Sequence, residues 1–154
     1  MVTFYLKDGL SPEFFPTRAY KDDTGLDVRT TQDITLEPLE RALVGTGVKA
    51  GITQPNVEIQ VRSRSGNALK HGVVVLNSPG TIDPGYKGEI KVILANLSNK
   101  PVSFKAGDRI AQLVVATFIE DGWIENDRDR WNDTEVAGNV LAGRGAGGFG
   151  STGN

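Results

Sequence analysis

Apolar and polar side chains alternate along several short stretches of the chain. Val57, Ile59 and Val61 are each followed by a polar residue, and the same alternation recurs from Ile90 to Asn96. A period of two is typical of a strand with one buried face. Shorter apolar stretches predict further strands at Arg41–Val48, Val73–Leu76, Val102–Phe104 and Ile110–Phe118.

Turn-forming residues separate these stretches, and only one short helix is predicted. Pro101, Pro84-Gly85 and Gly107-Asp108 are typical of turns. The helix is predicted to have Ser65 as its N-cap and to stop at Gly72. Many short strands with turn signals predict an all-β sandwich or barrel.

Composition divides the chain into a core and two C-terminal segments of a single domain. Residues 1–119 are predicted to form the β-rich core. Residues 120–142 are polar, carry Trp123 and Trp131, and are predicted to be an extended connector that packs on a neighbouring subunit. Residues 143–154 are rich in glycine, and we expect this arm to be flexible when nothing is bound.

Charge and composition exclude several classes of function. The 154 residues include 17 Lys and Arg against 19 Asp and Glu, so a bound anion needs a local site rather than a bulk positive field. With no cysteine and a single histidine, His71, the chain has no thiol nucleophile and no multi-histidine metal site. Apolar runs are too short to span a membrane, and the N-terminus does not resemble a signal peptide. We therefore expect a cytoplasmic protein (in the host cytosol if the gene is viral) that binds neither nucleic acid nor membrane.

The segment Arg64-Ser65-Gly66, at the predicted helix start, is a candidate anion site. Gly66 permits close approach to the backbone, Ser65 offers a hydroxyl, and the first turn of a helix presents unpaired N–H groups. The alternative is an ordinary helix cap beside a solvated arginine.

The segment Asn77–Gly88 predicts a rigid loop. Its three glycines and two prolines fix the backbone, which suits recognition of a planar hydrogen-bonding edge such as a nucleobase. Asp83 places a carboxylate at the tip, and Tyr86 places a ring nearby. The alternative is a hairpin with an Asp-Pro-Gly turn.

The glycine-rich C-terminal arm carries an unusual set of side chains. One cation, one aromatic ring and two hydroxyls stand on an otherwise bare backbone, at Arg144, Phe149, Ser151 and Thr152. This set suits a tail that folds over a phosphate-bearing ring. The alternative is an ordinary disordered tail.

Five segments, taken in order, resemble the five motifs of the trimeric dUTPase family. They span almost the whole chain, and the third and fifth are the most specific. The segments are Asp23-Thr-Gly-Leu-Asp27, Arg64-Ser-Gly66, Gly80-Thr-Ile-Asp-Pro-Gly-Tyr-Lys-Gly88, Gly107-Asp-Arg-Ile-Ala-Gln-Leu113 and Arg144-Gly-Ala-Gly-Gly-Phe-Gly-Ser-Thr-Gly153.

The resemblance implies a jelly-roll-like subunit in a homotrimer whose three sites are each built from all three chains. The implied reaction splits dUTP into dUMP and diphosphate by attack of water on the α-phosphorus, with Mg²⁺ bound to the triphosphate. Such an enzyme supplies dUMP and excludes uracil from DNA.

The resemblance also assigns roles around the nucleoside. Asp83 would be the base that activates the attacking water, Tyr86 would pack under the deoxyribose and exclude a 2′-hydroxyl, and Asn77 would read uracil. Further substrate contacts are implied at Gly80, Ile82 and Lys91.

Around the phosphates, Ser65, Gly66 and Gln112 would hold oxygens with support from Arg64, and Asp27 would contact Mg²⁺ through water. The arm residues expected to close over the substrate are Arg144, Phe149 (stacked on uracil), Gly150, Ser151 and Thr152.

The sequence departs from the family pattern at two positions of the second motif. Ser63 stands where many members have proline, and Asn67 stands where a small or aliphatic residue is usual. Both leave the geometry of that loop open.

Two other functions compete with the diphosphatase. A dCTP deaminase of related fold needs a glutamate on the strand after the third motif; Ile93 occupies the expected position, and Glu89 lies too close to the turn. A regulator that binds a partner protein could use the tryptophan-bearing connector.

Overall fold

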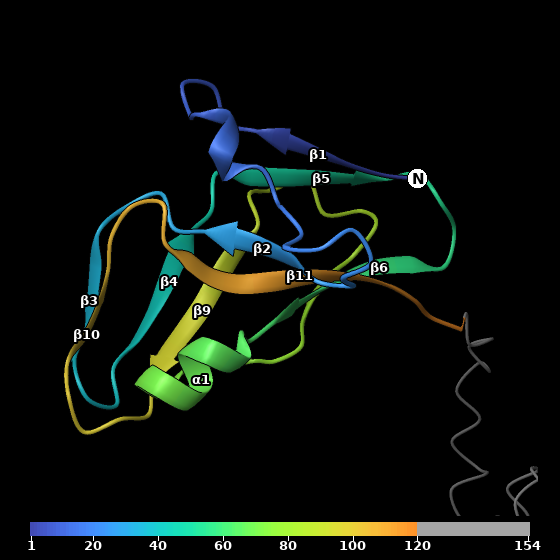
Figure 1. The fold of residues 1–154 in the computed structure, drawn as a ribbon. Coiled ribbons are helices and arrows are strands. Elements are labelled where there is room, and N and C mark those ends of the chain that lie inside the picture. Colours follow the sequence, from blue (N-terminus) through green and yellow to red (C-terminus); the bar gives the residue numbers. More distant parts are fainter. Residues whose placement is uncertain (120–154) are drawn as a thin grey trace, which may run out of the picture. The chain divides into compact units, whose positions relative to one another are not determined.

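The computed structural model describes residues 1–119, whose regular elements are nearly all β-strands (Figure 1). The elements in chain order are β1 (Val2–Leu6), the 3₁₀ turn η1 (Pro12–Phe14), β2 (Leu26–Arg29), β3 (Ile34–Leu36), β4 (Arg41–Gly45), β5 (Val48–Ile52), β6 (Val57–Arg62), α1 (Ser65–His71), β7 (Val73–Val75), β8 (Gly80–Ile82), β9 (Lys91–Asn96), β10 (Val102–Phe104) and β11 (Arg109–Thr117).

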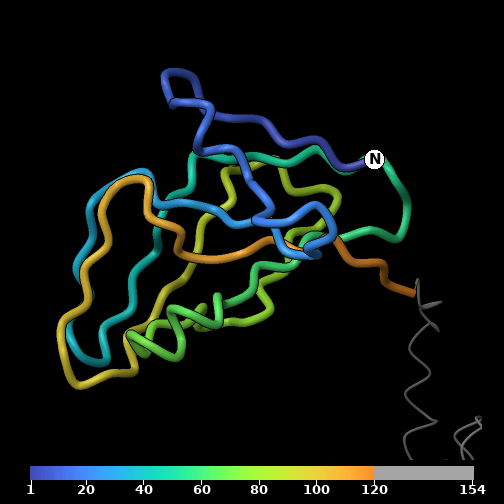
Figure 2. Tube along the Cα trace, viewed as in Figure 1, coloured from blue at the N-terminus to red at the C-terminus, as the bar shows by residue number. Residues whose placement is uncertain are grey.

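The strands form four small antiparallel sheets. The largest has the order β2-β11-β6-β8, and a three-stranded sheet has the order β4-β9-β7. The pairs β1-β5 and β3-β10 complete the fold, and Figure 2 shows each pair as two chain segments running side by side. Neighbours that are far apart in sequence, such as β2 and β11, make this an all-β, jelly-roll-like architecture, as predicted.

The core lies where the two larger sheets contribute alternate side chains. On β6, Val57, Ile59 and Val61 are buried while the intervening residues are at least partly exposed. Val92 and Leu94 of β9 are completely buried in the same cluster. The alternation seen in the sequence marks the buried face correctly on β6. On β9 the prediction was wrong for Asn96, a polar residue that is completely buried because its amide donates to the carbonyl oxygens of Leu36 and Lys100.

Two boundaries differ clearly from the prediction. The strand predicted over Arg41–Val48 ends at Gly45, and a new strand begins at Val48, after Gly47 with its φ of +69°. Ser65 was predicted as the N-cap of the helix, and this is wrong: Arg64 has the extended N-cap conformation and Ser65 is the first helical residue. The helix stops as predicted at Gly72, whose φ of +67° lies in the left-handed region that favours glycine.

Strands β1, β2, β3, β5 and β8 were not predicted, and β8 was taken as loop. β1 carries a clear alternation that could have been found, since Val2, Phe4 and Leu6 are its partly buried positions. None of the helical segments within residues 1–119 is long and apolar enough to cross a membrane. The predicted connector and arm, with Trp123, Trp131 and the arm residues named above, lie outside the described residues.

Candidate functional site

The strand β8 leads directly into the turn that carries Asp83. The Tyr86 N–H donates to the Asp83 carbonyl oxygen at 3.0 Å, which closes a four-residue turn with Pro84 and Gly85 in the middle. The predicted turn is confirmed. Asp83 is exposed, and within residues 1–119 its carboxylate has no hydrogen-bond partner. A carboxylate fixed on a rigid turn in this way is available to a bound molecule.

A cavity of about 280 Å³ lies beside this turn. Within residues 1–119 it brings together the residues predicted around the nucleoside, namely Asn77, Gly80, Ile82, Asp83, Tyr86 and Lys91. The side chain of Asn77 lies against Gly80, since a Cβ on that glycine would be only 3.1 Å from the Asn77 Nδ2. The absence of a side chain at Gly80 therefore makes room for the amide of Asn77.

A second polar group surrounds the carboxylate of Asp27 on β2. Arg64 donates to both carboxylate oxygens, at 2.7 and 3.2 Å, and Arg109 donates to one of them at 3.1 Å. The Asp27 side chain is 16% exposed, against 45% for Arg109. Two guanidinium groups share one carboxylate here, so the group keeps a net positive charge that suits an anion.

The start of α1 lies next to this ion-pair group and is open to a ligand. Ser65 is exposed, and a Cβ built on Gly66 would meet no atom within 4 Å. Gln112 on β11 donates from Nε2 to the Ser63 carbonyl oxygen at 2.8 Å, while its carboxamide lies over the bare backbone of Gly25. The first, second and fourth motifs thus meet in one region.

Both departures from the family pattern have a structural role in this chain. The Ser63 Oγ accepts the Val75 N–H at 2.8 Å, which joins the loop before α1 to β7. Asn67 is buried, and its Nδ2 donates to the Arg109 carbonyl oxygen at 3.0 Å. These bonds fix the loop that presents Ser65 and Gly66.

Within one chain, the Asp83 cavity and the Arg64 region are separate. Arg64, Asn67 and Arg109 line a different cavity of about 450 Å³ that shares no lining residue with the first. In the antiparallel β6–β8 pairing, Gly80 lies opposite Val61 and Ile82 lies opposite Ile59. The end of β8 that leads to Asp83 is therefore the end farther from Arg62 and α1. The four residue steps of β6 from position 58 to 62 alone span about 13 Å.

The described residues fit only a metal that the substrate itself largely holds. No group of three or more acidic or histidine side chains in residues 1–119 could form a metal site. Asp27 lies beside the predicted phosphate contacts, and two arginines already bind it. Asp108 lines the same cavity as Arg64. Mg²⁺ retains several waters and accepts substrate phosphates with one or two carboxylates, so these residues are compatible with it.

Comparison with known proteins identifies the family of this chain. The family model described as dUTPase matches residues 13–153. The chain belongs to the dUTPase family. This confirms the resemblance seen in the sequence.

Relatives and solved structures agree with the family. A deoxyuridine 5'-triphosphate nucleotidohydrolase of Solibacter usitatus is 44% identical over 140 residues, covering 90% of this chain and 87% of the relative. One from Clostridium kluyveri is 46% identical over 138 residues, covering 90% and 89%. The crystal structure of a dUTPase from Streptococcus mutans has a TM-score of 0.70 and 29% identity, covering 77% of this chain and 98% of that one.

The segment that follows the third motif of this dUTPase bears on the deaminase alternative. Ile93 lines the Asp83 cavity, at the position where a deaminase would need its glutamate. Glu89 lines other cavities instead, and its carboxylate accepts the Gly47 N–H at 2.7 Å. An apolar side chain at position 93 cannot move a proton, so the geometry does not favour deamination.

Proposed function

We propose that this chain is a dUTP diphosphatase, which hydrolyses dUTP to dUMP and diphosphate with Mg²⁺, supplies dUMP and excludes uracil from DNA. The observation that carries the proposal is an exposed carboxylate, Asp83, on a rigid turn beside a small cavity lined by Asn77 and Tyr86. The names of the relatives, at 44% and 46% identity, point to the same reaction.

The cavity suits a nucleoside rather than a whole triphosphate. Ligand pockets usually enclose roughly 300–1,000 Å³, and this one is about 280 Å³. We assign uracil to the amide of Asn77 and the backbone around Gly80 and Ile82, and the deoxyribose to the ring of Tyr86. Lys91 completes the lining.

Asp83 is proposed as the base for in-line attack of water at the α-phosphorus. The carboxylate would accept a proton from the water and orient it, and the diphosphate would leave on the opposite side. Hydrolysis of a polyphosphate needs positioning, charge neutralisation and one base, and it needs no covalent nucleophile. The absence of cysteine from the chain is therefore no obstacle.

The phosphates are assigned to the second polar group. Ser65, Gly66 and Gln112 would donate to phosphate oxygens, and Arg64 would add positive charge. Asp27 would hold Mg²⁺ through water, because a carboxylate that already accepts three arginine hydrogen bonds retains a lone pair for one more donor. The ion would neutralise phosphate charge.

A homotrimer with shared sites explains why the two parts of the site lie apart within one chain. A single dUTP must place its α-phosphorus near both Asp83 and Ser65, and the β6–β8 register directs these residues in opposite directions. We propose that the cavity of one subunit faces the phosphate-binding region of another. The C-terminal arm, with Arg144, Phe149, Gly150, Ser151 and Thr152, is proposed to close over the bound nucleotide.

The test compares Asp83→Asn with the parent protein, using dUTP and dCTP as substrates and measuring diphosphate and ammonia. We expect diphosphate from dUTP, and we expect Asp83→Asn to bind a dUTP analogue normally but to turn over roughly 10²–10⁴-fold more slowly. Glu37→Gln, an exposed carboxylate outside both cavities, should behave as the parent does. Ammonia from dCTP would refute the diphosphatase, and normal turnover by Asp83→Asn would remove Asp83 as the base.

A further inference from the structure

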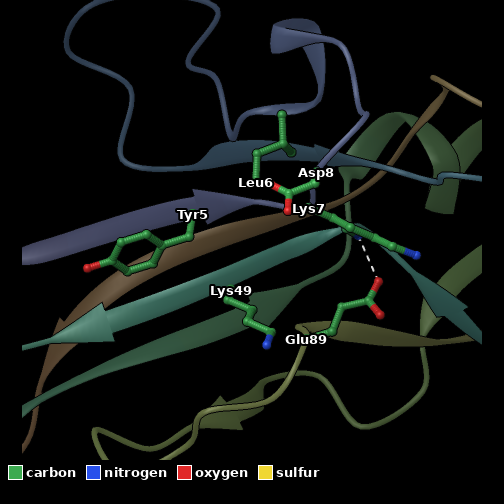
Figure 3. Close-up of a pocket in the computed structure, with 7 residues that line it drawn as sticks. Tyr5, Leu6, Lys7, Asp8, Lys49 and Glu89 are labelled. Atoms are coloured by element: carbon green, nitrogen blue, oxygen red, sulfur yellow. Dashed lines mark hydrogen bonds between the residues drawn. The ribbon is translucent and has the colours of Figure 1, made fainter.

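Glu89 follows the third motif, and the mechanism proposed above gives it no role. Figure 3 shows its side chain pointing to the turn between β4 and β5, where Oε1 accepts the Gly47 N–H at 2.7 Å. The residue is half-buried. It lines a cavity of about 420 Å³ together with Tyr5, Lys7 and Lys49, away from Asp83.

The turn receives this carboxylate because it lacks side chains. A Cβ on Gly45 would stand 2.8 Å from the Glu89 Oε1, which is closer than real Cβ atoms come. Gly47 has a φ of +69°, a conformation that other residues rarely adopt. The two glycines therefore form a cradle into which the side chain of Glu89 fits.

The peptide group that follows Glu89 is fixed to the same turn. The Ile90 N–H donates to the Val48 carbonyl oxygen at 2.8 Å, and the Ile90 carbonyl oxygen accepts the Thr46 hydroxyl at 2.6 Å. Ile90 itself is completely buried. The side chain and the main chain of residue 89 are thus held by adjacent residues, Gly47 and Val48.

The same peptide group holds the ring of Tyr86. The Tyr86 hydroxyl donates to the Glu89 carbonyl oxygen at 2.8 Å. The ring lies directly over Gly88, because a Cβ there would overlap the phenol end of the side chain. With 44% of its surface exposed, Tyr86 has few other contacts to fix its position. The orientation of the ring in the nucleoside cavity therefore depends on where the Glu89 carbonyl lies.

We infer that Glu89 is a positioning residue that sets how strongly the site discriminates deoxyribonucleotides from ribonucleotides. Its carboxylate fixes residue 89 on the β4–β5 turn, its carbonyl fixes the Tyr86 hydroxyl, and the fixed ring leaves no room for a 2′-hydroxyl. The inference rests on the proposed function, since it assigns the deoxyribose to Tyr86.

Selectivity, rather than stability, distinguishes this role from a structural one. Loss of an anchor that only stabilised the fold would lower the melting temperature and affect dUTP and UTP equally. Loss of an anchor that positions Tyr86 changes the ratio of kcat/KM for dUTP to that for UTP, because only UTP meets the ring with its 2′-hydroxyl.

The experiment measures this ratio in Glu89→Ala, Glu89→Gln and Lys49→Ala, with melting temperatures recorded alongside. Glu89→Ala removes the acceptor for the Gly47 N–H, and we expect the ratio to fall roughly two- to tenfold, the range for one net hydrogen bond. Glu89→Gln keeps an acceptor oxygen and should retain the ratio. Lys49→Ala alters the same cavity without touching this chain of bonds, so it should retain the ratio too.

A double-mutant cycle with Tyr86→Phe tests the route of the effect. Tyr86→Phe alone should lower the ratio, and adding Glu89→Ala to it should lower the ratio no further. An unchanged ratio in Glu89→Ala, or additive effects in the double variant, would overturn the inference.

Failure of the proposed function would be visible separately. If the parent protein released no diphosphate from dUTP, the proposed reaction would be wrong. The ratio of calorimetric affinities for dUMP and UMP would then test Glu89 in the same variants, with the same expected order.

Discussion

The sharing of Asp27 between two arginines leads to a prediction that separates two roles for this carboxylate. If Asp27 acts only on Mg²⁺ through water, replacing it should matter only when metal and nucleotide are bound. If it also holds Arg64 and Arg109 in place, Asp27→Asn should destabilise the protein without any ligand. The structure favours the second role, because three hydrogen bonds of 2.7, 3.1 and 3.2 Å join the carboxylate to the two arginines.

The size of the effect follows from the charges and their burial. A hydrogen bond to a charged group is worth roughly 1.5–3 kcal/mol, and an asparagine keeps one acceptor oxygen. The Asp27 side chain is 16% exposed and that of Arg64 is 22% exposed, so solvent compensates only in part. We therefore expect Asp27→Asn to lower the free energy of unfolding by about 2–3 kcal/mol.

The assay is urea unfolding at one fixed protein concentration, with and without Mg²⁺, together with dUTP kinetics at saturating Mg²⁺. We expect the loss of stability in metal-free buffer and a raised KM even when Mg²⁺ is in excess. Asp23→Asn is the control, since this carboxylate accepts a single hydrogen bond, from the Tyr20 N–H at 2.8 Å, which asparagine can also accept. A variant as stable as the parent, with a defect that excess Mg²⁺ repairs, would refute the reasoning.

Three further predictions concern other parts of the chain. Ending the chain after Ala142 should lower kcat/KM for dUTP strongly, because the removed arm is proposed to close over the nucleotide. The mass of the oligomer, measured by light scattering, should otherwise stay unchanged. Asn96→Ala should lower the free energy of unfolding in urea by about 2–4 kcal/mol, because this completely buried side chain donates to the carbonyl oxygens of residues 36 and 100 and accepts from Ser98. The hydrogen bond from Lys105 lowers the pKa of Asp33. The stability from this pair is therefore present above the unfolded-state pKa of Asp33 and is lost as the pH falls through its folded-state pKa. The melting temperatures of Asp33→Asn and the parent should converge in acid, and a difference that stays constant with pH would contradict this.

Local patterns in the sequence were enough where one element determines its own environment. The strand around Ile59 was predicted correctly because its alternation reports a single buried face, and the helix ended at Gly72 as predicted because a left-handed residue favours glycine. The strand break at Gly47 was missed. At this break the Gly47 N–H donates to a carboxylate 42 positions away in the chain, and no local pattern contains that contact.

The candidate site, too, was predictable from the sequence only in part. The motifs indicated Asp83, Tyr86 and Asn77 as one group, and the structure brings them to one cavity because they flank the short strand β8. No separate role was predicted for Arg109 beyond its place in the fourth motif. Its hydrogen bonds with Asp27 and Asn67 are visible only in the three-dimensional structure.

The sequence by itself determined which chemical groups this protein possesses and the family to which it belongs. The reason is that the motifs are defined by side-chain types and their spacing within short segments, which do not depend on how the chain folds. Only the tertiary structure decided that two arginines share one carboxylate, that Glu89 reaches the β4–β5 turn, and that the cavity beside Asp83 and the Arg64 region lie apart in one chain. The physical reason is that antiparallel pairing joins residues that are distant in sequence, and its register, which sets these distances, depends on the packing of every strand together.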